Sequence, residues 1–178
     1  IGTIALYEGI ENILKCIKQW DNEHIKFLLI GDGPHKNDIL KYIETNNLQK
    51  NVIYLGKMDH RNVIQYYNMI DIVAYPRKSK YDLCKTTCSY KLLEAMAMEK
   101  PIVVSNLDAY RECIIDNENG LYSDPDNVDD LFDKLTLLIE NKEMRTNLGK
   151  SAREWVINNR EWIDVSQCLI NIYDNLIG

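Results

Sequence analysis

Residues 88–105 read Cys-Ser-Tyr-Lys-Leu-Leu-Glu-Ala-Met-Ala-Met-Glu-Lys-Pro-Ile-Val-Val-Ser and join a helix directly to a buried strand. Ser89 has a side chain typical of a helix N-cap, and the residues from Tyr90 to Met98 are mostly good helix formers. Pro101 ends the helix, and the apolar, β-branched run after it is typical of a central strand in a parallel sheet. This pattern indicates an α/β protein.

The start of this helix carries groups that suit a nucleotide. A helix N-terminus presents unpaired N–H groups and the positive end of the helix dipole, and both attract phosphate. Lys91 adds a cation in the first turn, where a cation is unfavourable unless an anion is bound. Glu94, one turn later, can accept hydrogen bonds from two ribose hydroxyls. The alternative is an ordinary surface Lys–Glu pair, which contributes about 0.2–0.5 kcal/mol.

This stretch resembles the donor-site signature of retaining glycosyltransferases of family 4, which have the GT-B fold. The similar residues are those from Tyr90 to Ala97 and those from Lys100 to Ser105. The family places two glutamates eight positions apart. Glu94 matches the second, whereas Thr86 occupies the position of the first. The resemblance therefore implies a ribose contact for Glu94 and leaves the catalytic residue unassigned.

The rest of the chain alternates between predicted strands and helices. We expect strands at 1–5, 26–30, 51–56, 70–75, 101–105 and 121–122, with helices at 10–20, 35–46, 61–69, 90–98 and 109–113. This alternation predicts a doubly wound, Rossmann-like parallel sheet with helices on both faces. Helices at 128–140, 142–158 and 162–176 form a predicted C-terminal tail. The resemblance implies one nucleotide-sugar-binding domain over residues 1–178, the C-terminal half of a GT-B fold, with the N-terminal acceptor domain outside this chain.

Ligands of an open α/β sheet bind at the carboxyl ends of its strands, where turns follow directly. Gly31 begins a Gly-Asp-Gly-Pro turn that also occurs in the family, but Lys36 stands where a dinucleotide-binding fingerprint has its third glycine. The resemblance implies that Lys91 and Arg77 contact the diphosphate, and that segment 57–59 lies against the base. The implied nucleotide-sugar site comprises Gly9, Gly31, Arg77, Ser89, Tyr90, Lys91 and Glu94.

Glu8 is unexpected directly before the turn at Gly9, because members of the family that this sequence resembles often carry basic residues near this turn. A carboxylate directly before Gly9 cannot attract phosphate, so the positive charge must come from elsewhere. Glu8 could contact a sugar hydroxyl, or it could simply complement the dipole of the helix that follows.

Composition limits the possible classes of protein. A net charge of −6 over 178 residues argues against a nucleic-acid-binding surface. Since the sequence has no long apolar run and no leader pattern, we expect no membrane span in this chain. The chain opens with Ile1, which suggests a piece of a longer protein. The five scattered cysteines indicate free thiols in the cytoplasm: Cys16, Cys84, Cys88, Cys113 and Cys168.

No metal or other cofactor is expected. Asp124-Pro125-Asp126 superficially resembles an Asp-x-Asp metal site, but the following Asn127 and helical stretch favour a turn and a helix N-cap.

The resemblance implies that a UDP- or GDP-sugar is the donor, and that the sugar passes with retention to a glycan or lipid-linked acceptor. It also implies that this chain alone transfers no sugar. Two alternatives remain open at this stage: a non-catalytic nucleotide-binding module of the same fold, and half of a sugar-nucleotide epimerase. Whether an upstream half of the protein carries a Gly-rich acceptor-side loop would distinguish the glycosyltransferase from these two alternatives.

Overall fold

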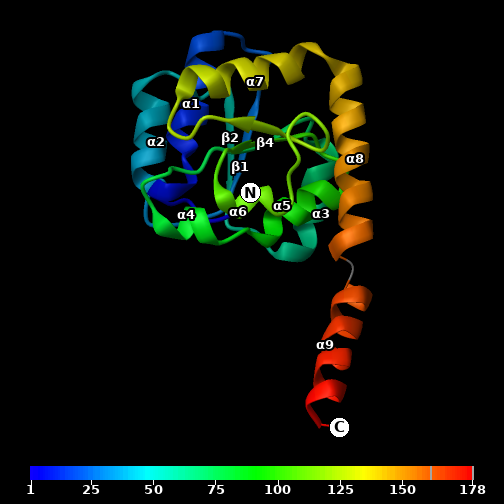
Figure 1. The fold of residues 1–178 in the computed structure, drawn as a ribbon. Helices are drawn as coiled ribbons and strands as arrows, with labels where there is room; N and C mark the ends of the chain where they lie inside the picture. The colour runs from blue at the N-terminus through cyan, green and yellow to red at the C-terminus, as the bar shows by residue number, and fades with distance from the viewer. Residues whose placement is uncertain (161, 178) are drawn as a thin grey trace.

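The structure is a computed structural model that describes residues 1–160 and 162–177. Short parallel strands form its centre, and helices surround them (Figure 1). The strands are β1 (Phe27–Ile30), β2 (Val52–Gly56), β3 (Val73–Tyr75), β4 (Ile102–Ser105) and β5 (Leu121–Ser123). The pairs β1–β2, β3–β4 and β4–β5 are all parallel. The predicted α/β class with parallel strands is confirmed.

Helices cover both faces of the strands. They are η1 (Leu6–Glu8), α1 (Ile10–Trp20), α2 (Lys36–Thr45), α3 (His60–Met69), α4 (Asp82–Thr86), α5 (Tyr90–Ala97), α6 (Asp108–Arg111), α7 (Val128–Glu140), α8 (Lys142–Arg160) and α9 (Trp162–Ile177). One apolar cluster packs α1, α2 and α7 against β1 and Val103. A second cluster packs α3, α5 and α6 against β3 and the other face of β4. β4 therefore has the two covered faces that its apolar sequence predicts, whereas Ile53 and Leu55 of β2 are exposed.

The strands form two sheets, in the orders β1–β2 and β3–β4–β5, where the sequence predicted one. The sheet is divided because residues 1–5, where a strand was expected, do not form one. This segment makes backbone hydrogen bonds to one edge of β1, from Gly2 N to the Ile30 carbonyl (2.8 Å) and from Ile4 N to the Asp32 carbonyl (2.9 Å), without forming a full ladder. Nothing therefore pairs β1 with β3 in the described part of the chain.

The segment between β3 and α5, where no helix was predicted, contains a short helix. α4 ends at Thr86, which places that residue on a helix, with its hydroxyl bonded to the Asp82 carbonyl (3.2 Å). α4 is anchored by Cys84, which is fully buried. Ser89 has the extended backbone of an N-cap before α5, but its hydroxyl makes no capping bond. Ser89 therefore has the predicted backbone conformation of an N-cap, but its side chain does not make the predicted capping hydrogen bond.

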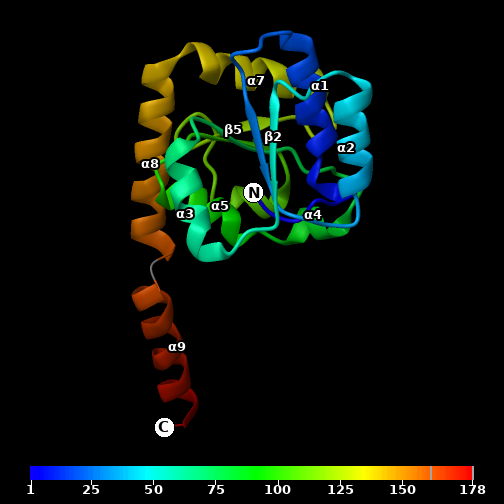
Figure 2. The same cartoon turned by 180° about the vertical axis from the view of Figure 1, so that it is seen from behind.

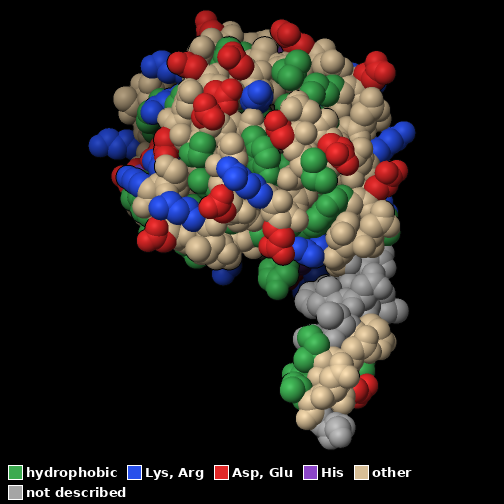
Figure 3. Space-filling view, viewed as in Figure 1, with side chains coloured by type: hydrophobic (Ala, Val, Ile, Leu, Met, Phe, Trp, Pro, Cys, Tyr) green, Lys and Arg blue, Asp and Glu red, His purple; other side chains and the backbone are tan. Residues whose placement is uncertain are grey.

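The helical tail is also as predicted. α8 packs against α5, and α9 continues past the end of α8 and lies away from the strands (Figures 1 and 2). Within residues 1–160 and 162–177, no helix is both long enough and apolar enough to cross a membrane. Acidic and basic side chains are interspersed over the face seen in Figure 3.

Candidate functional site

The predicted site residues gather where β1, β3 and β4 end. Gly31 follows β1, Arg77 follows β3, and Ser105 is the last residue of β4. The Ser105 hydroxyl donates to the Arg77 carbonyl (2.7 Å), which fixes the chain as it leaves β3. α5 starts nearby and supplies Lys91 and Glu94. The fold therefore brings together residues that are far apart in the sequence, at the strand ends where ligands of such sheets bind.

A buried carboxylate connects the two predicted phosphate ligands. Glu8 Oε1 lies 3.2 Å from Arg77 Nη2, and Glu8 Oε2 lies 2.6 Å from Lys91 Nζ. The side chain of Glu8 is 7% exposed, that of Arg77 6% and that of Lys91 15%. We call these three residues the Glu8 cluster. Sequence reasoning placed Arg77 and Lys91 in one site, but it missed the carboxylate that holds them.

Each cation in the Glu8 cluster has further partners. Arg77 donates from Nη1 to the Thr87 carbonyl (2.9 Å), and its guanidinium lies 5.8 Å from the centre of the Tyr110 ring. Lys91 Nζ lies 5.0 Å from the centre of the Tyr75 ring, a cation–π distance. Burial lowers the pKa of Lys91, and the hydrogen bond and charge of Glu8 oppose this shift. Two cations face one carboxylate, so the cluster keeps a net positive charge.

Glu94 lies beside this cluster and contacts different residues. Its Oε1 lies 2.9 Å from His60 Nε2, and its Oε2 lies 3.5 Å from the Tyr67 hydroxyl. Lys91 and Glu94 are therefore not the surface ion pair that was the alternative interpretation of this helix. The Glu94 side chain is 33% exposed, so at least part of the carboxylate is open to a ligand.

His60 contacts the candidate site residue Glu94, and sequence reasoning did not single it out. It is the first residue of α3 and follows segment 57–59, where the base was predicted to lie. The hydrogen bond and the charge of Glu94 raise the pKa of His60. The signal in the sequence was weak, because a lone histidine 34 residues from Glu94 has no spacing that links the two.

Both predicted glycine turns need glycine, because the chain's own backbone packs against them. Gly9 has φ 70°, and a Cβ there would lie 1.9 Å from the Pro76 carbonyl oxygen. Gly31 has φ 144°, and a Cβ there would lie 1.7 Å from the Gly2 carbonyl oxygen. Close backbone approach is present at both turns, between protein segments. Their contact with a ligand remains a prediction.

The remaining predicted residues at the start of α5 differ in accessibility. Tyr90 is 72% exposed, and the Ser89 hydroxyl is buried without a hydrogen-bond partner among the described residues. Thr86 lies on α4 with its hydroxyl turned to that helix, outside the Glu8 cluster. The structure places no carboxylate at this position.

The candidate metal motif is a turn, as predicted. Asp126 accepts from the Ser79 amide and hydroxyl, and Asn127 caps α7 by accepting from the amides of Asp129 and Asp130. In the described ranges, no group of three or more His, Cys, Asp or Glu side chains could hold a metal ion. Cys16, Cys84, Cys88 and Cys113 are free thiols, and the side chain of Cys168 lies outside the described residues.

Parallel strands, a helix N-terminus and cations at the strand ends define an α/β domain of the nucleotide-binding type. The model of the glycosyl transferases group 1 family matches residues 1–155. The chain belongs to this family.

Similar proteins agree with this assignment. An uncharacterized glycosyltransferase from Methanocaldococcus jannaschii is 28% identical over 155 residues, which are 87% of this chain and 41% of that protein. The crystal structure of Anabaena Alr3699/HepE in complex with UDP matches with a TM-score of 0.86 at 16% identity, over 98% of this chain and 48% of that one. The structure of the C-terminal domain of LpcC from Francisella tularensis matches with a TM-score of 0.79 at 21% identity, over 91% of this chain and 84% of that one.

The structural neighbours are glycosyltransferases, and the fold agrees with the Rossmann-like C-terminal half of GT-B enzymes. The chain spans less than half of the curated relatives it matches, with shares of 41%, 38% and 45%.

Proposed function

We propose that this chain is the donor-binding domain of a retaining glycosyltransferase of family 4, and that it binds a UDP- or GDP-sugar. The observation that carries the proposal is the placement of Glu94. Its partly exposed carboxylate lies one turn along α5 from a helix start that holds a buried, net positive cluster. This arrangement suits a diphosphate with a ribose attached. UDP in the Anabaena neighbour supports a nucleotide of this kind.

Each part of the nucleotide has a proposed partner. The α5 amides, Lys91 and Arg77 hold the diphosphate and stabilise its charge as it leaves the sugar. Glu94 accepts hydrogen bonds from the ribose hydroxyls. Glu8 acts on the ligand indirectly, because it fixes the positions of Arg77 and Lys91. The acceptor, a glycan or a lipid-linked molecule, binds a second domain, and the whole enzyme works in the cytoplasm.

We expect nucleotide binding to need no divalent metal. Metals in such sites neutralise phosphate charge, and here the two cations and the amides of α5 already supply positive charge. Titration with UDP or GDP in EDTA should give the same affinity as titration with magnesium or manganese. A loss of binding in EDTA that either metal restored would contradict this expectation.

Truncation of Glu94 tests the proposed function. Glu94→Ala should weaken binding of UDP or GDP by about 1–3 kcal/mol, or about 5- to 150-fold in Kd, because charged hydrogen bonds to the ribose are lost. Isothermal titration calorimetry measures this difference. Glu23→Ala is the matched control, since Glu23 forms an exposed pair with Lys50 and should leave Kd unchanged. Equal affinity of the parent and Glu94→Ala for the nucleotide would show that Glu94 does not bind the ribose.

The contact with His60 makes nucleotide binding depend on pH. His60 has a raised pKa in the fold, so its ion pair with Glu94 is complete below pH ~6.5 and is lost as the pH rises through that raised pKa. The ribose hydroxyls compete with His60 for the same carboxylate. We therefore expect several-fold tighter binding at pH 8 than at pH 6.

The control for this effect is His60→Gln, which keeps a hydrogen-bond donor but cannot titrate. Since the phosphate groups of the ligand titrate equally with both proteins, the difference between their pH profiles isolates His60. Parallel profiles for the parent and His60→Gln would show that His60 does not compete with the ribose.

A further inference from the structure

Two thiols meet between the start of α5 and the end of α6. The Sγ atoms of Cys88 and Cys113 lie 3.7 Å apart, although the residues are separated by 25 positions in the sequence. Cys88 directly precedes Ser89 at the start of α5, and Cys113 lies in the turn after α6. Neither cysteine lies within a helix or a strand, so regular backbone geometry does not fix their separation. We call Cys88 and Cys113 the thiol pair.

The surroundings of the thiol pair favour ionisation of one sulfur, and the thiolate is the reactive form of cysteine. The hydrogen bond with Cys88 lowers the pKa of Cys113, and the charge of Arg160 acts in the same direction. The same hydrogen bond raises the pKa of Cys88, so the two sulfurs hold one proton between them after the first ionisation. Cys113 is 2% exposed, whereas Cys88 is half-buried. A small oxidant therefore reaches the thiol pair from the side of Cys88.

Both segments that carry the thiol pair also hold Arg77 in place. The Thr87 carbonyl, one residue before Cys88, accepts a hydrogen bond from Arg77 Nη1 (2.9 Å). On the other segment, the centre of the Tyr110 ring lies 5.8 Å from the Arg77 guanidinium. The Tyr110 carbonyl in turn accepts a hydrogen bond from the Cys113 amide (3.0 Å). A change in the distance between the two sulfurs therefore moves groups that position Arg77.

We propose that the thiol pair is a reversible oxidation site, at which a peroxide converts Cys88 and Cys113 into an intramolecular disulfide that weakens diphosphate binding. The second half of this proposal rests on the proposed function, because it needs a phosphate site at Arg77. Formation of the bond draws the sulfurs from 3.7 Å to about 2.0 Å. The Thr87 carbonyl and the first amides of α5 then shift relative to the Glu8 cluster, and hydrogen bonds to phosphate weaken as their geometry is lost.

The oxidation takes place in two steps and needs only the peroxide. One sulfur of the thiol pair, as the thiolate, attacks a peroxide oxygen, the O–O bond breaks, and the sulfur becomes a sulfenic acid. The other sulfur then attacks the sulfenic sulfur, so that the S–S bond forms and the S–O bond breaks. The two thiols lose two electrons and two protons, and one hydrogen peroxide becomes two water molecules. Dithiothreitol reduces the disulfide again by thiol–disulfide exchange.

Peptide mapping tests the first half of the proposal. The 178-residue chain with Cys168→Ser is treated with hydrogen peroxide, unfolded, alkylated and digested without reductant. Mass spectrometry should identify a cross-link between Cys88 and Cys113 as the main thiol product, and dithiothreitol should remove it. Cys16 and Cys84 are internal controls, because their thiols contact backbone carbonyls at 3.8 and 3.7 Å. Both should be recovered in alkylated form.

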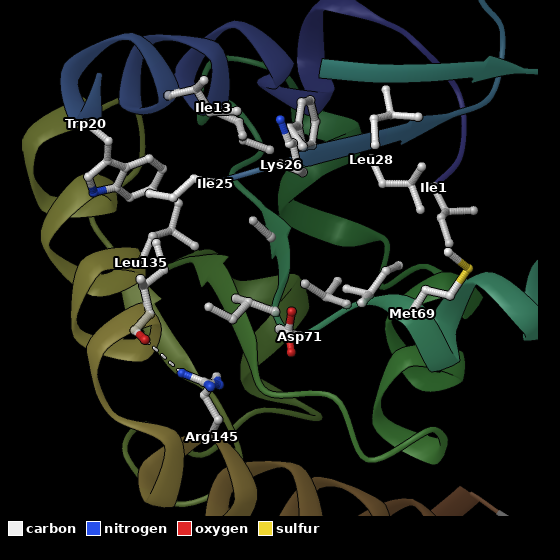
Figure 4. Close-up of a pocket in the computed structure, with 18 of the residues that line it drawn as sticks. Ile1, Ile13, Trp20, Ile25, Lys26, Leu28, Met69, Asp71, Leu135 and Arg145 are labelled. Carbon is white, nitrogen blue, oxygen red and sulfur yellow. Dashed lines mark hydrogen bonds between the residues drawn. The ribbon is translucent and has the colours of Figure 1, made fainter. Parts of the chain in front are cut away.

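Hydrogen peroxide also oxidises exposed thioethers, so Met69 requires a control. Met69 is 74% exposed and lines a cavity of about 550 Å³ between β1 and β3, where Figure 4 shows its sulfur. Neither Cys88 nor Cys113 lines this cavity. In Met69→Leu, the cross-link and its effect on nucleotide binding should both persist.

Calorimetric titration with UDP or GDP tests the second half. The oxidised protein should bind about tenfold more weakly than the reduced protein, a change typical of one weakened charged hydrogen bond, and dithiothreitol should restore the affinity. Cys88→Ser cannot form the cross-link, so its affinity should be equal before and after peroxide. Cys113→Ser provides the same test from the other side of the thiol pair, should the first variant fold poorly.

The two measurements distinguish failure of this proposal from failure of the proposed function. No cross-link between Cys88 and Cys113, or a cross-link only between two molecules, would overturn the oxidation site and leave the proposed function intact. A cross-link with equal affinity in both forms would overturn the effect on nucleotide binding. If the reduced protein bound no nucleotide, the proposed function and this effect would both fail, and peptide mapping would still decide the oxidation site.

Discussion

Replacing Glu8 with glutamine should lower the free energy of unfolding by about 3–5 kcal/mol, the usual cost of removing one partner from a buried ion pair. Glutamine keeps the shape of the side chain but leaves Arg77 and Lys91 without a counter-ion. Both cations are largely buried, with side-chain exposures of 6% and 15%, so water compensates their charges only in part. Urea denaturation followed by circular dichroism measures the loss.

The matched control is Glu23→Gln, which removes the same charge from an exposed pair with Lys50. Surface pairs contribute about 0–1 kcal/mol, so this variant should unfold close to the parent. A cost for Glu8→Gln as small as that of the control would show that Glu8 does not hold the two cations together.

Nucleotide should partly rescue the Glu8 variant. A bound diphosphate supplies negative charge to the same two cations, and ligands that bind only the folded state raise its stability. The rise in Tm on adding UDP or GDP should therefore be larger for Glu8→Gln than for the parent. An equal rise in Tm in both proteins would show that the phosphate groups do not bind at the Glu8 cluster.

Local sequence signals predicted most of the elements. The helix expected at 90–98 is α5 (Tyr90–Ala97), and the strand expected at 101–105 is β4 (Ile102–Ser105). Capping residues, a proline stop and an apolar β-branched run act over a few residues, so they can be recognised without the fold. α4 was missed because a helix of five residues shows no periodic pattern.

The contacts that define the site could not be predicted in this way. Glu8 lies 69 residues from Arg77 and 83 from Lys91, so no local spacing links them. The sequence pointed to Arg77 and Lys91 from the strand end and the helix start, and the fold brings these two cations together, but the sequence could not show that a carboxylate lies between them. The division of the sheet was likewise unpredictable, because residues 1–5 bond to the end of β1 without forming a full ladder between β1 and β3.

The 178-residue chain should transfer no sugar at a useful rate when it is tested alone. Transfer requires the acceptor hydroxyl to be held against the anomeric carbon, and such positioning can account for about 7–11 kcal/mol of the barrier. This chain matches 41% of the length of the Methanocaldococcus relative, and the function proposed for it is to bind the donor alone. Without a bound acceptor, the rate should therefore fall by about 10⁵- to 10⁸-fold.

In the proposed two-domain enzyme, closure of the second domain over the donor would also exclude water, and this chain alone would not provide that closure. We therefore expect nucleotide binding with, at most, slow hydrolysis of the nucleotide sugar. The test is incubation of the 178-residue chain with UDP- and GDP-sugars and with glycan or lipid-linked acceptors, followed by mass spectrometry of the products. A parallel calorimetric titration separates lack of binding from lack of transfer. Glycosylated product at ordinary enzymatic rates would show that one domain holds both substrates, and the two-domain interpretation would then be wrong.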